Sequence, residues 1–78
     1  MNYNNLLTQK IYTLLEPLVG SSMAKATLKV QFQKLGISEE SLGIKDLQNL
    51  ANLIEKGLTV FLGSETARGI SLNIAKMA

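Results

Sequence analysis

The chain has 78 residues, of which 46% are hydrophobic and 18% are charged, and its net charge is +2. This composition is typical of one small globular domain, and so small a charge does not by itself indicate nucleic-acid binding. The sequence has no Cys and no His, which excludes disulfides, thiolate catalysis and the common zinc sites. A serine nucleophile would also lack a His to activate it. We therefore expect no enzyme, no metal and no cofactor.

The beginning of the sequence carries no targeting signal that we recognise. Its first residues, MNYNNLLTQK, lack the charged and then apolar order of a signal peptide. Uncharged runs elsewhere are far shorter than a membrane span requires. We expect a cytoplasmic protein that does not contact a membrane.

The first predicted helix begins after Asn4 or Asn5, either of which can cap it. Pro17 disfavours a helical Glu16 and removes a hydrogen-bond donor, so a break or kink is expected within Glu16–Ser21. The residues expected on its apolar face are Leu7, Ile11, Leu14, Leu15 and Leu18.

A second helix is predicted from about Ser22 to Leu35, with Ser21 or Ser22 as its cap and Gly36 ending it. This helix has two apolar faces, which suits a helix between two others. One face consists of Met23, Ala26 and Val30, and the other of Leu28, Phe32 and Leu35.

The longest periodic stretch is a central helix over residues 44–62, preceded by a single turn near Ser38–Leu42. Gly57 lies between its main stripe and two further apolar residues, Leu53 and Val60. The main stripe, expected to be core, consists of Ile44, Leu47, Leu50, Ala51, Ile54, Leu58, Phe61 and Leu62.

Gly63 ends the central helix, and Ser64 is expected to cap the last one. The core face of this helix is predicted to be Ala67, Ile70, Ile74 and Met77. The sequence thus predicts one all-α domain over residues 1–78, a small bundle of four main helices plus a short helical turn.

A faint internal repeat links the two halves of the chain. Leu14-Leu15-Glu16 precedes Gly20-Ser21 in the first half, and Leu53-Ile54-Glu55 precedes Gly63-Ser64 in the second. The spacing between the two parts differs by about one helical turn. Each half therefore reads as a helix, a Gly-Ser break and a helix rich in small residues.

Surplus apolar surface makes self-association the leading expectation. Leu53, Gly57 and Val60 project away from the central stripe, and Leu28 with Phe32 project away from Met23 and Val30. A contiguous apolar patch usually marks an interface, and a twofold homodimer is the commonest way to bury one. We predict a protein-interaction module, with these residues as interface candidates and a homodimer as the favoured assembly. The competing explanation is that the first and last helices flank the central helix and cover both its sides within one chain.

Nucleic-acid binding is the alternative, and we weigh it lower. Residues 32–42, FQKLGISEESL, resemble a helix-turn-helix with Gly36 in the turn, although Glu39 and Glu40 would then face phosphates. The candidate basic face consists of Lys25, Lys29 and Lys34. Lys34 points to a different side of the helix from the other two, and the three are more readily explained as a solvated surface.

The sequence shows two further resemblances, one local and one extending over much of the chain. Glu40-Ser41-Leu42 before a helix resembles the phosphopantetheine site of acyl carrier proteins, which are usually acidic. A broader pattern runs through Pro17-Leu-Val-Gly20, Leu35-Gly36-Ile37, Leu42-x-x-x-Asp46-Leu47 and Ile54-Glu55-x-x-Leu58-x-x-Phe61-Leu62-Gly63. It resembles the small α-helical domains appended to bacterial signalling proteins. That resemblance implies an accessory interaction module.

Overall fold

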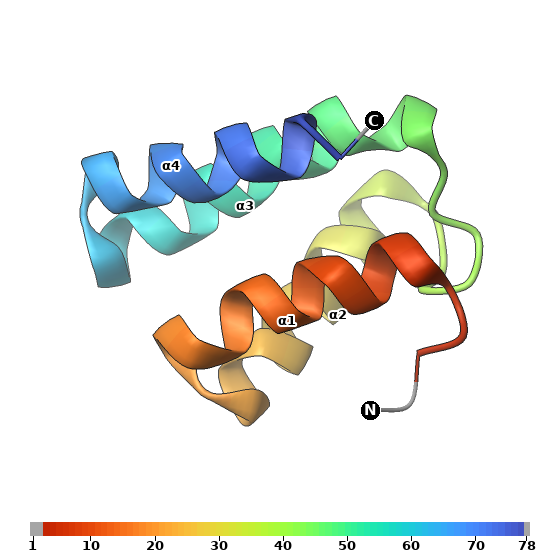
Figure 1. The fold of residues 1–78 in the computed structure, drawn as a ribbon, viewed down its shortest axis with the longest axis horizontal. Helices are drawn as coiled ribbons and strands as arrows, with labels where there is room; N and C mark the ends of the chain where they lie inside the picture. Colours follow the sequence, from red (N-terminus) through yellow and green to blue (C-terminus); the bar gives the residue numbers. More distant parts are fainter. Residues whose placement is uncertain (1–2, 78) are drawn as a thin grey trace.

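The computed structural model describes residues 3–77. These residues contain helices and no strand, so the predicted all-α bundle of four main helices is confirmed (Figure 1). The elements are α1 (Leu6–Val19), α2 (Ser21–Leu35), the 3-10 turn η1 (Ile44–Asp46), α3 (Leu47–Leu62) and α4 (Ser64–Ala75).

The four helices form two helical hairpins that pack on one another. In Figure 1 the α1–α2 hairpin lies below the α3–α4 hairpin, with α2 and α3 behind α1 and α4. Contact is closest within each hairpin, α2 packs against α3, and α1 touches α4 least. The outer side of α2 and α3 therefore forms one continuous face of the molecule.

The core is built from the inward faces of all four helices. Ile54 is fully buried near the middle of α3, as its place in the apolar stripe predicts. The largest fully buried apolar side chains are Ile11, Leu15, Leu28, Leu47, Leu50, Ile54, Leu58 and Ile74.

The two ends of the predicted central stripe are not core. Ile44 is 64% exposed and Phe61 is 63% exposed. Ile44 lies in η1, before α3 begins at Leu47, and Phe61 lies in the last turn of α3. An apolar stripe is buried only where a neighbouring helix packs on it. Here the stripe extends beyond the neighbouring helices at Ile44 and at Phe61.

A single glycine turns the chain in each hairpin. Gly20 and Gly63 have nearly the same backbone, with φ/ψ of 86°/163° and 83°/160°. Their N–H groups donate to the carbonyls of Glu16 and Thr59 at 2.8 and 2.9 Å. Their own carbonyls accept from the N–H groups of Ala24 and Ala67 at 3.0 and 3.1 Å. The two corners are therefore the same structure, built twice.

These corners give the internal repeat its correct register. Counting from the glycines pairs Leu15 with Leu58 and Ala24 with Ala67, and all four are buried. The match between Leu14-Leu15-Glu16 and Leu53-Ile54-Glu55 lies about one helical turn out of this register, which is the difference in spacing seen in the sequence. The hairpins match where the chain turns, because the corner conformation is the feature that they share.

The predicted break within Glu16–Ser21 is confirmed, but the expectations of a non-helical Glu16 and of serine caps on α2 and α4 are wrong. α1 continues through Pro17 to Val19, although the proline removes the hydrogen bond that an N–H at this position would donate to the Thr13 carbonyl. The chain still breaks at Gly20, inside the predicted window. No serine side chain caps α2 or α4, and the N-cap residues are Gly20 and Gly63.

The predicted cap at Asn5 is confirmed, and it also holds the loop after α2. Asn5 Oδ1 accepts from the N–H groups of Leu7 and Thr8 at 2.9 and 3.2 Å. Its Nδ2 donates to the carbonyls of Glu40 and Leu42 at 3.1 and 2.8 Å. Asn5 therefore joins the start of α1 to the loop that places Leu42 in the core.

Replacing Asn5 by Ala should destabilise the chain by about 1–2 kcal/mol, because the helix cap and the loop contact are lost together. Asn5→Asp is the matched variant, since its carboxylate still caps α1 but cannot donate to the loop. We expect Asn5→Asp to cost less than Asn5→Ala in urea unfolding. Equal stability of Asn5→Ala and the unaltered chain would contradict the role assigned to this side chain.

Candidate interaction surface

The two apolar faces of α2 have the opposite exposure to that predicted. Leu28 and Phe32, predicted to lie at an interface, are buried in the core. The other face is accessible: Met23 is half-buried, Ala26 is exposed and Val30 is 46% exposed. The face with the larger side chains turned inward, since it removes more apolar area from water. Leu28 and Phe32 are therefore not available on the surface of this chain.

The accessible face of α2 meets α3 in a shallow groove of about 170 Å³. We call this hollow the α2–α3 groove. Ala26 and Gly57 keep it open because they carry little or no side chain. Its lining residues are Met23, Ala26, Thr27, Val30 and Gln31 of α2 and Gly57 of α3.

Three predicted interface residues share this side of α3. Gly57 lines the groove, and Leu53 and Val60 lie about one turn before and after it. Val60 is 87% exposed, whereas Leu53 is half-buried. The groove therefore adjoins an apolar strip on α3 as well as the one on α2.

Gln31 is a groove residue that the sequence analysis missed. Its side chain is only 5% exposed, and its buried carboxamide oxygen Oε1 has no hydrogen-bond partner. A Cβ on Gly57 would lie 3.1 Å from Gln31 Nε2, so the glycine makes room for the amide. The sequence did offer a signal for its burial. Gln31 lies three residues after Leu28 and four before Leu35, which is the spacing of residues on the same apolar face of a helix. Buried unpaired acceptors are rare, which singles this position out.

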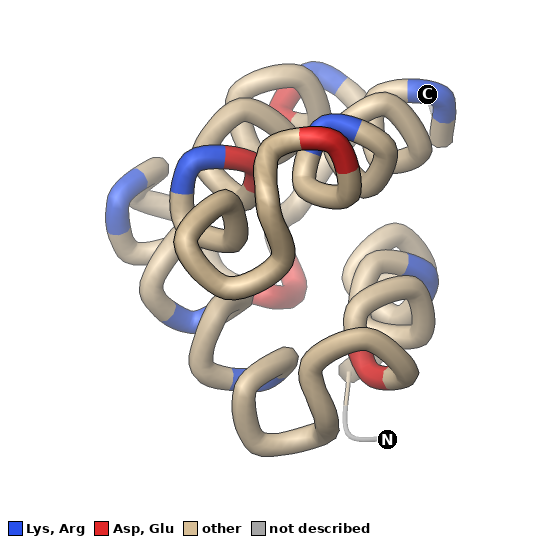
Figure 2. Tube along the Cα trace, turned by 90° about the vertical axis from the view of Figure 1, so that its left-hand side faces the viewer, with Lys and Arg blue, Asp and Glu red and all other residues tan. Residues whose placement is uncertain are grey.

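Lys34 borders the groove on α2, and Lys56 lies on α3 beside Val60, about 100° around the helix from Gly57. Lys34 follows Val30 by one turn on α2, and Lys56 precedes Val60 by one turn on α3. α2 carries only basic charges, as its trace in Figure 2 shows, and Glu55, the acid of α3, points about 160° away from Gly57. The groove sides of these two helices therefore bear positive charge and no carboxylate.

The predicted basic face is divided between two sides of α2. Lys25, Lys29 and Lys34 are all exposed. Lys25 and Lys29 lie one turn apart, and both are about 100° or more from Val30 around the helix. Only Lys34 borders the groove.

The loop after α2 has neither geometry suggested by the sequence resemblances. Residues 36–43 contain turns and no α-helix, so Glu39 and Glu40 do not head a recognition helix. The Ser41 hydroxyl accepts from the Ser38 N–H at 2.9 Å and lies before η1 rather than at the start of an α-helix. A hydrogen-bonded turn is present here, in which the Ser41 N–H donates to the Ser38 carbonyl at 3.1 Å. The short helical turn predicted near Ser38–Leu42 lies later, in η1.

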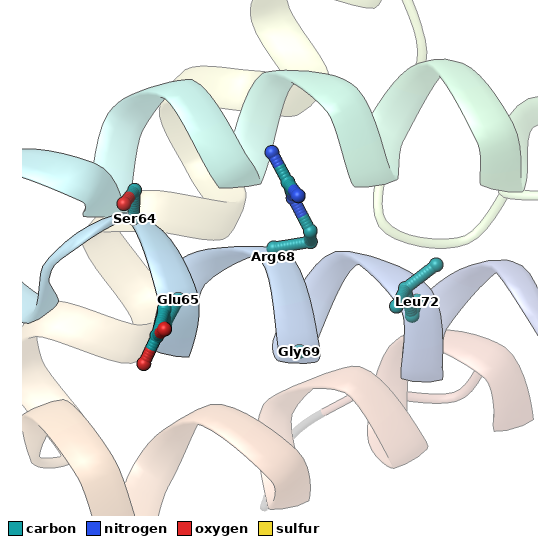
Figure 3. Close-up of a pocket in the computed structure, with 5 residues that line it drawn as sticks. All are labelled: Ser64, Glu65, Arg68, Gly69 and Leu72. Atoms are coloured by element: carbon teal, nitrogen blue, oxygen red, sulfur yellow. The ribbon is translucent and has the colours of Figure 1, made fainter.

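A second hollow of about 260 Å³ lies on α4 around Gly69 (Figure 3). Its lining comes from α4 alone, so it has no opposing wall. Glu65 and Arg68 point to different sides of it. Both hollows are smaller than the roughly 300–1,000 Å³ typical of small-molecule sites. Neither hollow argues for a buried small ligand. The lining residues are Ser64, Glu65, Arg68, Gly69 and Leu72.

The titratable groups of the described residues do not form a reactive cluster. Tyr12 donates to Glu16 at 2.7 Å, and this hydrogen bond together with burial raises the pKa of Tyr12. Burial and the Glu39 carboxylate raise the pKa of Tyr3, whose ring lies 5.7 Å from that of Tyr12. Both changes hold the phenols neutral. Within residues 3–77, no three His, Cys, Asp or Glu side chains gather as metal ligands do.

Comparison with protein-family models, with curated proteins and with solved structures gave no match. None of the helices described here combines the length and apolar character needed to cross a membrane. The functional argument therefore rests on the α2–α3 groove and its charges.

Proposed function

We propose that this chain is a non-enzymatic protein-interaction module that binds a helical segment of a partner in the α2–α3 groove. The observation that carries the proposal is the groove itself, an apolar strip on two helices around a floor of small residues. Amphipathic helices commonly bind such grooves through residues spaced three and four apart. Ala26 and Gly57 would allow the partner's backbone to approach closely.

Gln31 supports the same proposal at the floor of the groove. Its carboxamide oxygen is unpaired, while the amide nitrogen lies toward Gly57. A rotation of the amide exchanges these two ends. A hydroxyl on the partner helix can donate or accept, so it could pair with whichever end of the amide faces the groove. An apolar groove with one polar group at its floor is a common way to fix the register of a bound segment.

The biological setting is also part of the proposal. The resemblance to helical domains appended to bacterial signalling proteins supports a cytoplasmic signalling accessory role.

Binding of designed helical peptides tests the groove. The probe is a peptide with leucines spaced three and four apart and neutral polar residues elsewhere. Leu53→Glu with Val60→Glu should abolish its binding while circular dichroism shows unchanged helical content. The control is Leu6→Glu with Leu72→Glu, two exposed residues outside the groove, which should leave the affinity within about twofold. Equal loss in both double variants would contradict docking in the groove.

A homodimer is the second form of this proposal. Leu53 and Val60 lie on either side of Gly57, so two antiparallel α3 helices would place Leu53 of each copy near Val60 of the other. In that case sedimentation at tens of micromolar should give the mass of a dimer. Leu53→Glu with Val60→Glu should then give a folded monomer. A monomer mass for the unaltered chain would rule out the homodimer and leave a helix of another protein as the proposed occupant.

A further inference from the structure

We propose that the segment bound in the α2–α3 groove is an acidic amphipathic helix of another protein. This inference rests on the proposed interaction function and adds the chemistry of the partner. The expected helix has one apolar stripe, with Asp or Glu along both edges of the stripe.

The arrangement of charge around the groove carries the inference. Lys34 borders the groove on α2 and Lys56 lies beside the apolar strip of α3, and each is one turn from an exposed valine. A helix whose apolar stripe covers Val30 and Val60 would therefore place its two edges beside these lysines. α2 has no carboxylate at all, and Glu55 points away from the groove. Complementary charges of this kind steer a partner and fix its orientation.

The same charges argue against a second copy as the occupant. Antiparallel pairing of α3 about Gly57 would bring Lys56 of the two copies close together at the twofold axis. Like charges placed opposite one another oppose association. None of the helices in residues 3–77 has a net negative charge, because α1, α3 and α4 each carry one acid and one base and α2 carries three lysines. One of these helices from a second copy would therefore not supply the acidic edges.

The apolar floor distinguishes a protein from a nucleic acid. Phosphates would also be attracted to Lys34 and Lys56, but they would leave Val30 and Val60 in contact with water. A helix with an apolar stripe covers these valines and neutralises the lysines at the same time. Lys25 and Lys29 would be the more accessible site for phosphates, since they lie on the open side of α2.

Two peptides with the same leucine stripe, one with Glu and one with Lys along its edges, test the inference. Affinity is measured by fluorescence anisotropy at low and at physiological salt. We expect the acidic peptide to bind at least about tenfold more tightly than the basic one, and the difference to shrink with added salt. Lys34→Glu with Lys56→Glu should reverse the preference.

Lys25→Glu with Lys29→Glu is the matched control, because it changes the net charge equally on another side of α2. It should retain most of the preference for the acidic peptide. If both double variants lose that preference equally, the attraction belongs to the whole molecule and the inference is wrong. A preference for the basic peptide would overturn the acidic partner and leave groove docking intact.

The remaining outcomes separate this inference from the proposed function. If neither charged peptide nor the neutral one binds, groove docking fails and the inference fails with it. A stable dimer that excludes the acidic peptide would overturn the inference in favour of a second copy. A short DNA duplex that displaces the peptide, with its affinity lost in Lys25→Glu with Lys29→Glu, would overturn it in favour of nucleic acid.

Discussion

Replacing Ile54 by Ala should lower the free energy of unfolding by about 2–5 kcal/mol. Ile54 is fully buried in α3, which packs against both α2 and α4. Truncation would leave a cavity where the two hairpins meet. The loss combines the transfer energy of the missing methyl groups with the cost of that cavity.

Urea unfolding followed by circular dichroism measures this effect. Val60→Ala is the control on the same helix, because Val60 is 87% exposed. It should change stability by no more than about 0.5 kcal/mol. A loss of less than about 1 kcal/mol for Ile54→Ala would show that the hairpins do not pack through this residue.

Replacing Gly63 by Ala should cost about 1–3 kcal/mol, and Gly20→Ala should cost a similar amount. Both glycines combine a φ near +85° with a ψ near 160°. This is a region of backbone space that essentially only glycine occupies. A Cβ at either position would have no neighbour within 4 Å, so the cost comes from the backbone and not from a steric clash.

Gly69 provides a matched control for the corner glycines. It lies within α4, and a Cβ there would also meet nothing within 4 Å. Gly69→Ala should therefore stabilise the chain by up to about 1 kcal/mol, through the higher helix propensity of alanine. Stabilisation of the same size in Gly63→Ala would mean that the corner is not built as described.

The features predicted well from the sequence are those set by local chemistry. Glycines at 20, 36 and 63 ended the expected helices because each adopts a positive φ. At Gly36 the Ile37 N–H donates to the Phe32 carbonyl at 3.1 Å, which is the expected C-terminal cap. The period of α3 likewise placed Ile54 in the core.

The features predicted poorly depend on which neighbour covers which face. α2 has two apolar faces, and periodicity does not say which one turns inward, so Leu28 and Phe32 were assigned to the wrong side. For the same reason Ile44 and Phe61 were expected to be core, although no helix covers the ends of the stripe. Gln31 was missed because the lack of a hydrogen-bond partner for its carboxamide oxygen becomes visible only in the three-dimensional structure. The candidate site was therefore half predicted, through Leu53, Gly57 and Val60.

Amide chemical shifts of the labelled chain, recorded while the acidic peptide is added, locate the residues that the peptide contacts. If the α2–α3 groove is the docking surface, the largest changes should fall on Ala26, Val30, Gly57 and Val60. The amides of Glu65 and Gly69, beside the hollow on α4, should change little. Largest changes on α4 or α1, with the groove amides unmoved, would contradict the account.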